Sequence, residues 1–209
     1  MSTPILRLAG MTVVFAFSAG LHAAPRPEAA TPGATSSASA SASVNADYRQ
    51  QLLQLAEADQ KIRAETLKQY TPQQLQSEPG LARTLAMQIH ASQQQNQARL
   101  SELIAKYGFP DAAAVGADGA HAGFLLAQHA PDRAFRDTFL QGIEAAAQKG
   151  LYSKADLALF VDRNRVLAGQ PQLYATQRKA DGSLFEVEQP EQLQQRRAAM
   201  GLPDEAEKP

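Results

Sequence analysis

Apolar residues recur at steps of three and four over long stretches of this chain, and this spacing constrains its fold more than any other feature. The first series runs from Asn45 to Tyr70 and contains Tyr48, Leu52, Leu55, Ile62 and Thr66. Residues spaced in this way share one face of an α-helix. Helices with one apolar face are stable only when those faces pack together, which predicts a helical bundle.

Further helices are predicted where the same spacing continues between residues that break helices. They cover residues 81–107, 120–130, 131–149, 153–169 and 190–201, with a Gly- and Ala-rich loop at 109–119. Glycines that commonly end helices follow four of them, at positions 108, 150, 169 and 201. Asn45 and Ser153 are expected to cap two of the N-termini.

The apolar spacing changes to alternation near the C-terminus. Residues 172–177 and 183–188 alternate in this way, and Asp181-Gly182 lies between them. Two alternating segments joined by Asp-Gly predict a β-hairpin. The fold class that we expect is therefore mainly α, a bundle of about six helices with one β-hairpin near the C-terminus.

Residues 1–23 have the three parts of a secretory signal peptide: Arg7, an apolar run from Leu8 to Leu21, and Leu21-His22-Ala23 before the expected cleavage point. The run of about 14 residues is shorter than the roughly 20 that span a bilayer, so a cleaved signal is favoured over a retained anchor. Without a twin-arginine pair, the general secretory route is expected, and the destination is the periplasm if the cell is Gram-negative. No stable membrane span should remain after cleavage.

Residues 24–44 contain Ala, Ser, Pro and Thr and almost no large apolar side chain, which predicts a disordered linker, with a glycosylated stalk as the alternative. Residues 45–209 then form a single domain of ordinary size. The sequence contains no Cys, which excludes disulfides, thiolate metal sites and Cys nucleophiles. Its formal charge of −1 argues against nucleic acid as a partner.

His121, Gln128 and His129 lie on the predicted helix 120–130. The two histidines are about 12 Å apart along a straight helix, too far to hold one metal ion together. No metal and no cofactor are therefore expected, although one histidine could join Asp162 and another carboxylate. A structural imidazole bonded to the backbone is the simpler alternative.

Asp162 and Arg163 lie in a predicted helix whose preceding turn is apolar on nearly every side. Burial of two charges is costly unless each finds a partner. Adjacent helical residues face different directions, so the two side chains should pair with different elements. Asp59, Arg63 and the predicted hairpin are candidate partners. The pattern is typical of a structural ion-pair network, with a catalytic or ligand-binding carboxylate as the alternative.

Residues 169–177 have the most unusual composition. In a strand, Gln172, Tyr174 and Thr176 would point to one face and Gln177 to the other. This row of amide, phenol and hydroxyl groups could bind a polar ligand, or it could be the solvated face of the hairpin.

Several motifs of the chain occur together in one known family. They are Asn96, Tyr107-Gly108-Phe109-Pro110, His121, Gln128-His129, Asp162-Arg163, the block from Gly169 to Gln177 and Arg196-Arg197, with Asp59-Gln60 and Arg63 before them. Through them the domain resembles the bacterial domain of unknown function 6624 family. The resemblance implies no known reaction. It does mark polar residues that stand where the helical pattern expects apolar ones, such as Asp59 and Asn96.

Two positions depart from the pattern of that family. The family carries Trp where Phe109 stands and Gly where Ala175 stands. Phe lacks the indole N–H donor, and Ala does not easily adopt a positive φ. If that glycine allows a ligand to approach the backbone, this member should bind differently or not at all.

Signatures of common enzymes are missing from the sequence, which has no Gly-rich phosphate loop, no His-Glu-x-x-His motif and no Gly-x-Ser-x-Gly elbow. The favoured hypothesis is a non-enzymatic extracytoplasmic binding or interaction module, whose partner is an unknown polar ligand or an envelope protein. A hydrolase-like enzyme with His129 as base and Asp162 as its orienting carboxylate is one alternative. An inhibitor or immunity-like protein is another.

Overall fold

The computed structural model describes residues 44–179 and 181–205. Within them it has seven α-helices and one short 3-10 helix: α1 (Ala46–Gln69), α2 (Pro72–Ser77), α3 (Pro79–Tyr107), α4 (Ala112–Gln128), α5 (Arg133–Gln148), α6 (Lys154–Leu167), η1 (Pro190–Gln192) and α7 (Leu193–Ala199). The predicted signal peptide and all but the last residue of the predicted linker lie outside the described residues. None of the described helices is both long and apolar enough to cross a membrane.

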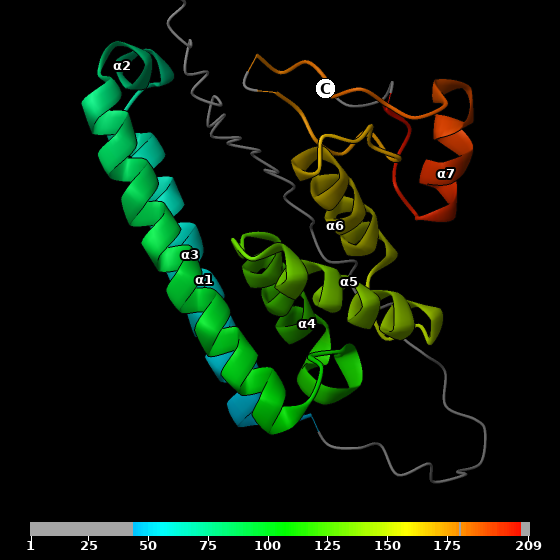
Figure 1. The fold of residues 1–209 in the computed structure, drawn as a ribbon. Helices are drawn as coiled ribbons and strands as arrows, with labels where there is room; N and C mark the ends of the chain where they lie inside the picture. Colours follow the sequence, from blue (N-terminus) through cyan, green and yellow to red (C-terminus); the bar gives the residue numbers. More distant parts are fainter. Residues whose placement is uncertain (1–43, 180, 206–209) are drawn as a thin grey trace, which may run out of the picture.

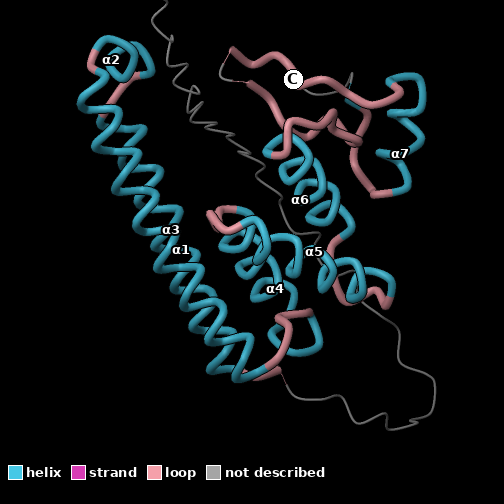
Figure 2. The backbone as a smooth tube through the Cα atoms, viewed as in Figure 1, coloured by secondary structure: helices cyan, strands magenta, loops and turns pink. Residues whose placement is uncertain are grey.

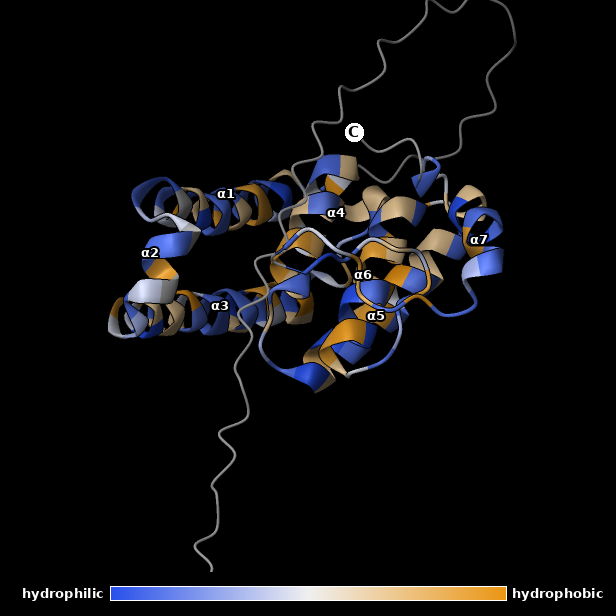
Figure 3. Cartoon of the chain, turned by 90° about the horizontal axis from the view of Figure 1, so that it is seen from above, coloured by the Kyte–Doolittle hydropathy of each residue, from blue (hydrophilic) through white to orange (hydrophobic). Residues whose placement is uncertain are grey.

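The two longest helices, α1 and α3, lie side by side, and α2 joins their far ends (Figure 1). Helix α4 packs against the other half of this pair, α5 and α6 pack against α4 and against each other, and α7 lies on the opposite side of the molecule. Seen from above, α1 and α3 extend away from the remaining helices with α2 between their tips (Figure 3). The arrangement confirms a mainly α fold.

The apolar core surrounds α4, which packs against α1 and α3 on one side and against α5 and α6 on the other. Its buried members include Tyr48, Leu52, Leu100, Phe124 and Phe160, which come from four different helices. Removing a large aliphatic or aromatic side chain from such a core typically costs about 2–5 kcal/mol. The core therefore fixes the mutual positions of the helices that carry the polar residues discussed below.

The predicted helix caps are confirmed. The side chain of Asn45 accepts a hydrogen bond from the backbone N–H of Tyr48 at 3.0 Å, at the start of α1. Ser153 accepts one from the backbone N–H of Asp156 at 3.2 Å, at the start of α6. Each cap satisfies an N–H group that has no partner inside its helix.

Two helical segments differ from the prediction. Helix α4 begins at Ala112, inside the predicted loop, because Asp111 caps it and an Ala-rich stretch follows. A kink at Gly116, with φ +75°, joins its two parts. The short helix α2 was not predicted, although Thr71 and Gln74 form a reciprocal capping box there.

The predicted β-hairpin is wrong, because the described residues contain no β-strand (Figure 2). The two alternating segments meet only at isolated bridges, Gln172 with Val187 and Arg178 with Leu184. The backbone N–H groups of residues 173, 174 and 176 donate to the carboxylate of Asp162 and so cannot form a ladder. Ala175, with φ +53°, leaves the extended conformation altogether.

Candidate functional site

Asp59 gathers three polar side chains from three helices. It lies on α1 and is only 3% exposed. Its carboxylate accepts hydrogen bonds from Arg63 Nε at 3.0 Å, one helical turn later, and from Asn96 Nδ2 on α3 at 3.2 Å. It also pairs with His129 Nδ1, at the end of α4, at 2.8 Å. A buried carboxylate with this many donors is well satisfied.

His129 presents one ring nitrogen to this carboxylate and keeps the other available. Because an ionised carboxylate can only accept, Nδ1 carries the proton and Nε2 carries the lone pair. Within residues 44–179 and 181–205, Nε2 makes no hydrogen bond, and the side chain is 12% exposed. His129 therefore holds an oriented hydrogen-bond acceptor at the edge of the cluster.

The charges in the cluster are set by burial and by neighbouring cations. Burial lowers the pKa of His129 to about 4, and the nearby Arg63 and Arg163 act in the same direction, against the pull of Asp59. Burial alone would raise the pKa of Asp59, but hydrogen bonds and positive charge from His129 and Arg63 outweigh it and hold that pKa below its usual value. At neutral pH the pair is a carboxylate with a neutral imidazole.

Arg163, on α6, brings a second guanidinium group to this region. Its Nε donates to the backbone carbonyl of Gln128 at 2.7 Å. No carboxylate of the described residues lies within ion-pair distance of it, and burial lowers its pKa to about 10. We call Asp59, Arg63, Asn96, His129 and Arg163 the Asp59 cluster. With two guanidinium groups and one carboxylate, the cluster has an excess positive charge.

Asp162, the residue before Arg163, belongs to a separate polar centre. It is fully buried, and its carboxylate accepts from the backbone N–H groups of Leu173, Tyr174 and Thr176 and from the Thr176 hydroxyl, at 2.6–3.1 Å. The chain from residue 172 to residue 177 thus wraps around one buried negative charge. As predicted, the two neighbouring charges have partners in different elements, and the predicted hairpin region supplies one of them.

The side chains of Gln172 and Gln177, which were expected to face a ligand, form hydrogen bonds inside the protein instead. We call residues 172–177 the closed loop. Gln172 is fully buried and donates to the carbonyls of Gln177 and Phe185, both at 3.0 Å, while its own oxygen accepts from the Gln177 N–H. The Gln177 side chain donates to the Thr176 hydroxyl. Arg197 reaches the Tyr174 carbonyl from α7. Most polar groups of this block are therefore satisfied within the protein.

The two positions expected to depart from the family pattern differ in burial, since Ala175 is fully buried and Phe109 is half-buried. Ala175 has a φ of +53°, which the glycine expected there would adopt without strain. The Phe109 ring packs against Phe139 and Tyr152, and a methyl group on Gly142 would lie 2.3 Å from it. Ala175 therefore affects backbone strain, and Phe109 affects the packing of the aromatic core.

His121 forms a third polar pair, away from His129. Its Nδ1 lies 2.9 Å from Asp156 Oδ2 on α6, and its ring stacks on Phe124. The hydrogen bond to Asp156 raises the pKa of His121, against a smaller effect of burial. The side chain is half exposed. The two predicted histidines thus have different carboxylate partners.

The structure brings together only part of the predicted set. Asp59, Arg63, Asn96, His129 and Arg163 converge, with Gln128 contributing its carbonyl. Asp162, Gln172, Tyr174, Thr176 and Gln177 form the closed loop, and His121 stands apart. The proposed pairing of His129 with Asp162 does not form, because Asp59 occupies that role and Asp162 binds backbone N–H groups. Within the described residues, no group of three or more His, Asp or Glu side chains could hold a metal.

Arg136, Asn164 and Asp156 were missed by the sequence analysis. Arg136 is buried on α5 and bonds to the carbonyls that follow His129. Its position on the apolar face of that helix, four residues before Leu140 and seven before Ile143, was the available signal. The partners of these three residues lie on other helices, so spacing within one helix could not reveal them.

The fold and the Asp59 cluster define a mainly α protein whose helices enclose a buried acid–histidine pair. The chain belongs to the family of unknown function DUF6624, whose model matches residues 46–208, as its motifs predicted. Comparison with curated proteins and with solved structures finds no match.

Proposed function

We propose that this domain is a ligand-binding module that takes an anionic group at the Asp59 cluster. The observation that carries the proposal is Arg163, a half-buried guanidinium group that forms no ion pair with any carboxylate of the described residues. A charge held partly away from water without a close counter-charge is costly, and an oxyanion would offset that cost. Arg63 adds positive charge, since its carboxylate partner Asp59 also serves His129 and Asn96.

His129 gives the site a second element of recognition. Its Nε2 lone pair can accept a hydrogen bond from a hydroxyl or N–H group of the ligand, while Nδ1 is held by Asp59. A ligand that carries both an oxyanion and a donor therefore fits better than a simple anion. The predicted export signal would place this binding outside the cytoplasm.

Inorganic phosphate, which has both oxyanion and donor oxygens near neutral pH, is a suitable probe. Imidazole 1H–15N spectra recorded at pH 6.5 should show a saturable shift of His129 Nε2 as phosphate is added. His90→Asn, His121→Asn and His129→Asn together assign the resonances. Arg163→Gln should weaken phosphate binding at least about tenfold, because charge-assisted hydrogen bonds contribute roughly 1.5–3 kcal/mol. Arg83→Gln, at an exposed position of α3, is the control. An unchanged affinity in Arg163→Gln would refute the proposal.

A hydrolase-like activity is a second candidate, and the Asp59–His129 pair is the observation that favours it. An oriented imidazole is a common general base. The pKa of about 4 makes His129 a weak base, however, since general bases are most effective near the working pH. Turnover of ester or amide substrates that is lost in His129→Asn and kept in His121→Asn would favour catalysis over simple binding.

A further inference from the structure

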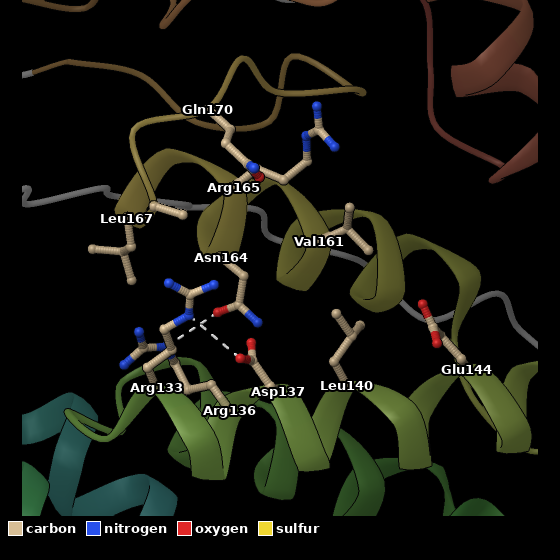
Figure 4. A pocket seen from close by; sticks show the side chains of 11 residues that line it. Arg133, Arg136, Asp137, Leu140, Glu144, Val161, Asn164, Arg165, Leu167 and Gln170 are labelled. Carbon is tan, nitrogen blue, oxygen red and sulfur yellow. Dashed lines mark hydrogen bonds and ion pairs between the residues drawn. The ribbon is translucent and has the colours of Figure 1, made fainter.

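Helices α5 and α6 border a hollow of about 260 Å³ (Figure 4). Its volume is slightly below the roughly 300–1,000 Å³ of ligand pockets, which suits a small molecule. It contains none of the five residues of the Asp59 cluster, although Arg163 lies next to its lining residue Asn164. The hollow can therefore be tested apart from the proposed function.

One end of the hollow contains a buried cation with only neutral partners. Arg136 is 8% exposed and donates to the carbonyls of Ala130 and Pro131 and to Asn164 Oδ1, at 2.6, 3.0 and 3.1 Å. No carboxylate within the described ranges forms an ion pair with it, and burial lowers its pKa. Asp132 and Asp137 act on this guanidinium group only from beyond ion-pair distance, and Asp137 already pairs with Arg133.

An enclosed amide stands beside that cation. Asn164 directs its oxygen to Arg136, and its Nδ2 is buried with no hydrogen-bond partner in the described part of the chain. A buried donor left unsatisfied costs about 1–3 kcal/mol. A carboxylate placed here would compensate the charge of Arg136, and Asn164 would donate to it once its side chain turns toward the hollow.

The opposite end of the hollow is acidic, and its middle is apolar. Glu144 lies there, exposed and without an ion pair to any described residue. Leu140 of α5 and Val161 of α6 lie between the two ends (Figure 4). Arg136 and Glu144 are eight residues apart on one helix, which corresponds to about 12 Å along its axis.

We propose that this hollow binds a peptide of about three residues with free termini. Its C-terminal carboxylate would lie at Arg136 and Asn164, its N-terminal ammonium at Glu144, and an apolar central side chain against Leu140 and Val161. Three extended residues span roughly 10–11 Å, which matches the separation of the two ends. Charge at both ends and apolar surface between them distinguish such a peptide from a simple anion.

The tripeptide Gly-Leu-Gly is the probe, titrated into the whole exported domain by calorimetry and by 1H–15N NMR. Amide shifts should concentrate on α5 and α6. C-terminal amidation should weaken binding at least about tenfold, since it removes a charge-assisted contact with buried groups. N-terminal acetylation should weaken it about three- to fivefold, as for an exposed ion pair. Gly-Gly-Gly should bind more weakly than Gly-Leu-Gly.

The variant Glu144→Gln tests the orientation of the peptide. It should bind Gly-Leu-Gly about three- to fivefold more weakly and should no longer distinguish it from its N-acetylated form. Glu57→Gln, at an exposed position of α1, should keep that distinction. Arg163→Gln should leave peptide binding unchanged, so the two proposals can fail separately. No binding, equal affinity for capped and free peptides, or shifts outside α5 and α6 would overturn the inference.

Discussion

His129 Nδ1 lies 2.8 Å from the carboxylate of Asp59, although 70 positions separate the two residues in the chain. The contact joins the middle of α1 to the last turn of α4. Because Asn96 of α3 binds the same carboxylate, three helices meet at one buried charge. The Asp59–His129 pair therefore helps to hold three helices together and is also the centre of the candidate site.

Asp59→Asn should destabilise the domain by about 3–5 kcal/mol. The change leaves Arg63 without its carboxylate and gives His129 a weaker partner, and breaking a buried pair on one side is costly. Urea unfolding measures the loss. Asp118→Asn, in an exposed pair with Arg49, should cost no more than about 1 kcal/mol. Similar losses in both variants would contradict the structural importance of the buried pair.

Stability should decrease as the pH is lowered from 6.5 toward 4. The pKa of His129 is about 4 in the folded protein and 6.5 ordinarily, so in this interval the unfolded chain binds more protons. The free energy of unfolding then falls with falling pH, by about 3 kcal/mol for a shift of this size. Urea titrations at several pH values measure the slope.

Only one of the two described histidine–carboxylate pairs, that of His129, should contribute to that slope. His129→Asn should reduce the loss of stability below pH 6.5. The raised pKa of His121 means that its contribution is fully present below pH 6.5 and is lost as the pH rises through its folded pKa. His121→Asn should therefore keep the acid-side decrease. An unchanged slope in His129→Asn would show that another group causes it.

Asp162→Asn should open the loop at residues 172–177. The carboxylate accepts hydrogen bonds from three backbone N–H groups and one hydroxyl, whereas an amide has one oxygen and brings donors of its own. We expect a loss of at least about 3 kcal/mol. Hydrogen exchange should show lost protection at Leu173, Tyr174 and Thr176. Asp181→Asn, at an exposed turn, should leave these amides protected.

Ala175→Gly should be better tolerated than Ala158→Gly, although both alanines are fully buried. Each change removes a buried methyl group, at about 0.8 kcal/mol. Glycine also relieves strain at Ala175, where φ is +53°, but weakens α6 at Ala158 by about 0.5–1 kcal/mol. In thermal unfolding, the free energy of unfolding of Ala175→Gly should exceed that of Ala158→Gly by at least about 1 kcal/mol. The reverse order would argue against strain at Ala175.

The helices could be predicted because their signals are local. The apolar spacing around Tyr48 and Leu52 and the caps at Asn45 and Ser153 act within one or two turns, so the sequence alone shows them. Helix α4 was predicted to begin too late because glycine was interpreted as loop, whereas Gly116 forms a kink inside a merged helix.

The hairpin and the partner of His129 could not be predicted, because distant contacts decide them. The alternation at residues 172–177 is real, but a carboxylate on α6 takes the N–H groups that a ladder would use. The alternative hypothesis of a hydrolase-like site paired His129 with Asp162, whereas the packing of α1 against α4 supplies Asp59 as its partner. Asp59 and Asn96, which stand where the helical pattern expects apolar residues, do lie in hydrogen-bond contact with each other.

Asp162 and Arg163 are consecutive residues of α6, yet one anchors the closed loop and the other reaches the carbonyl beside His129. A helix is stiff over so short a distance, so a movement of α6 must displace the Asp59 cluster and the loop at residues 172–177 together. A rotation of α6 that tightens Arg163 around an incoming anion would also turn Asp162 and pull on the loop that leads to α7. Binding of an anion at the Asp59 cluster would then change the position of α7, although the anion does not contact α7.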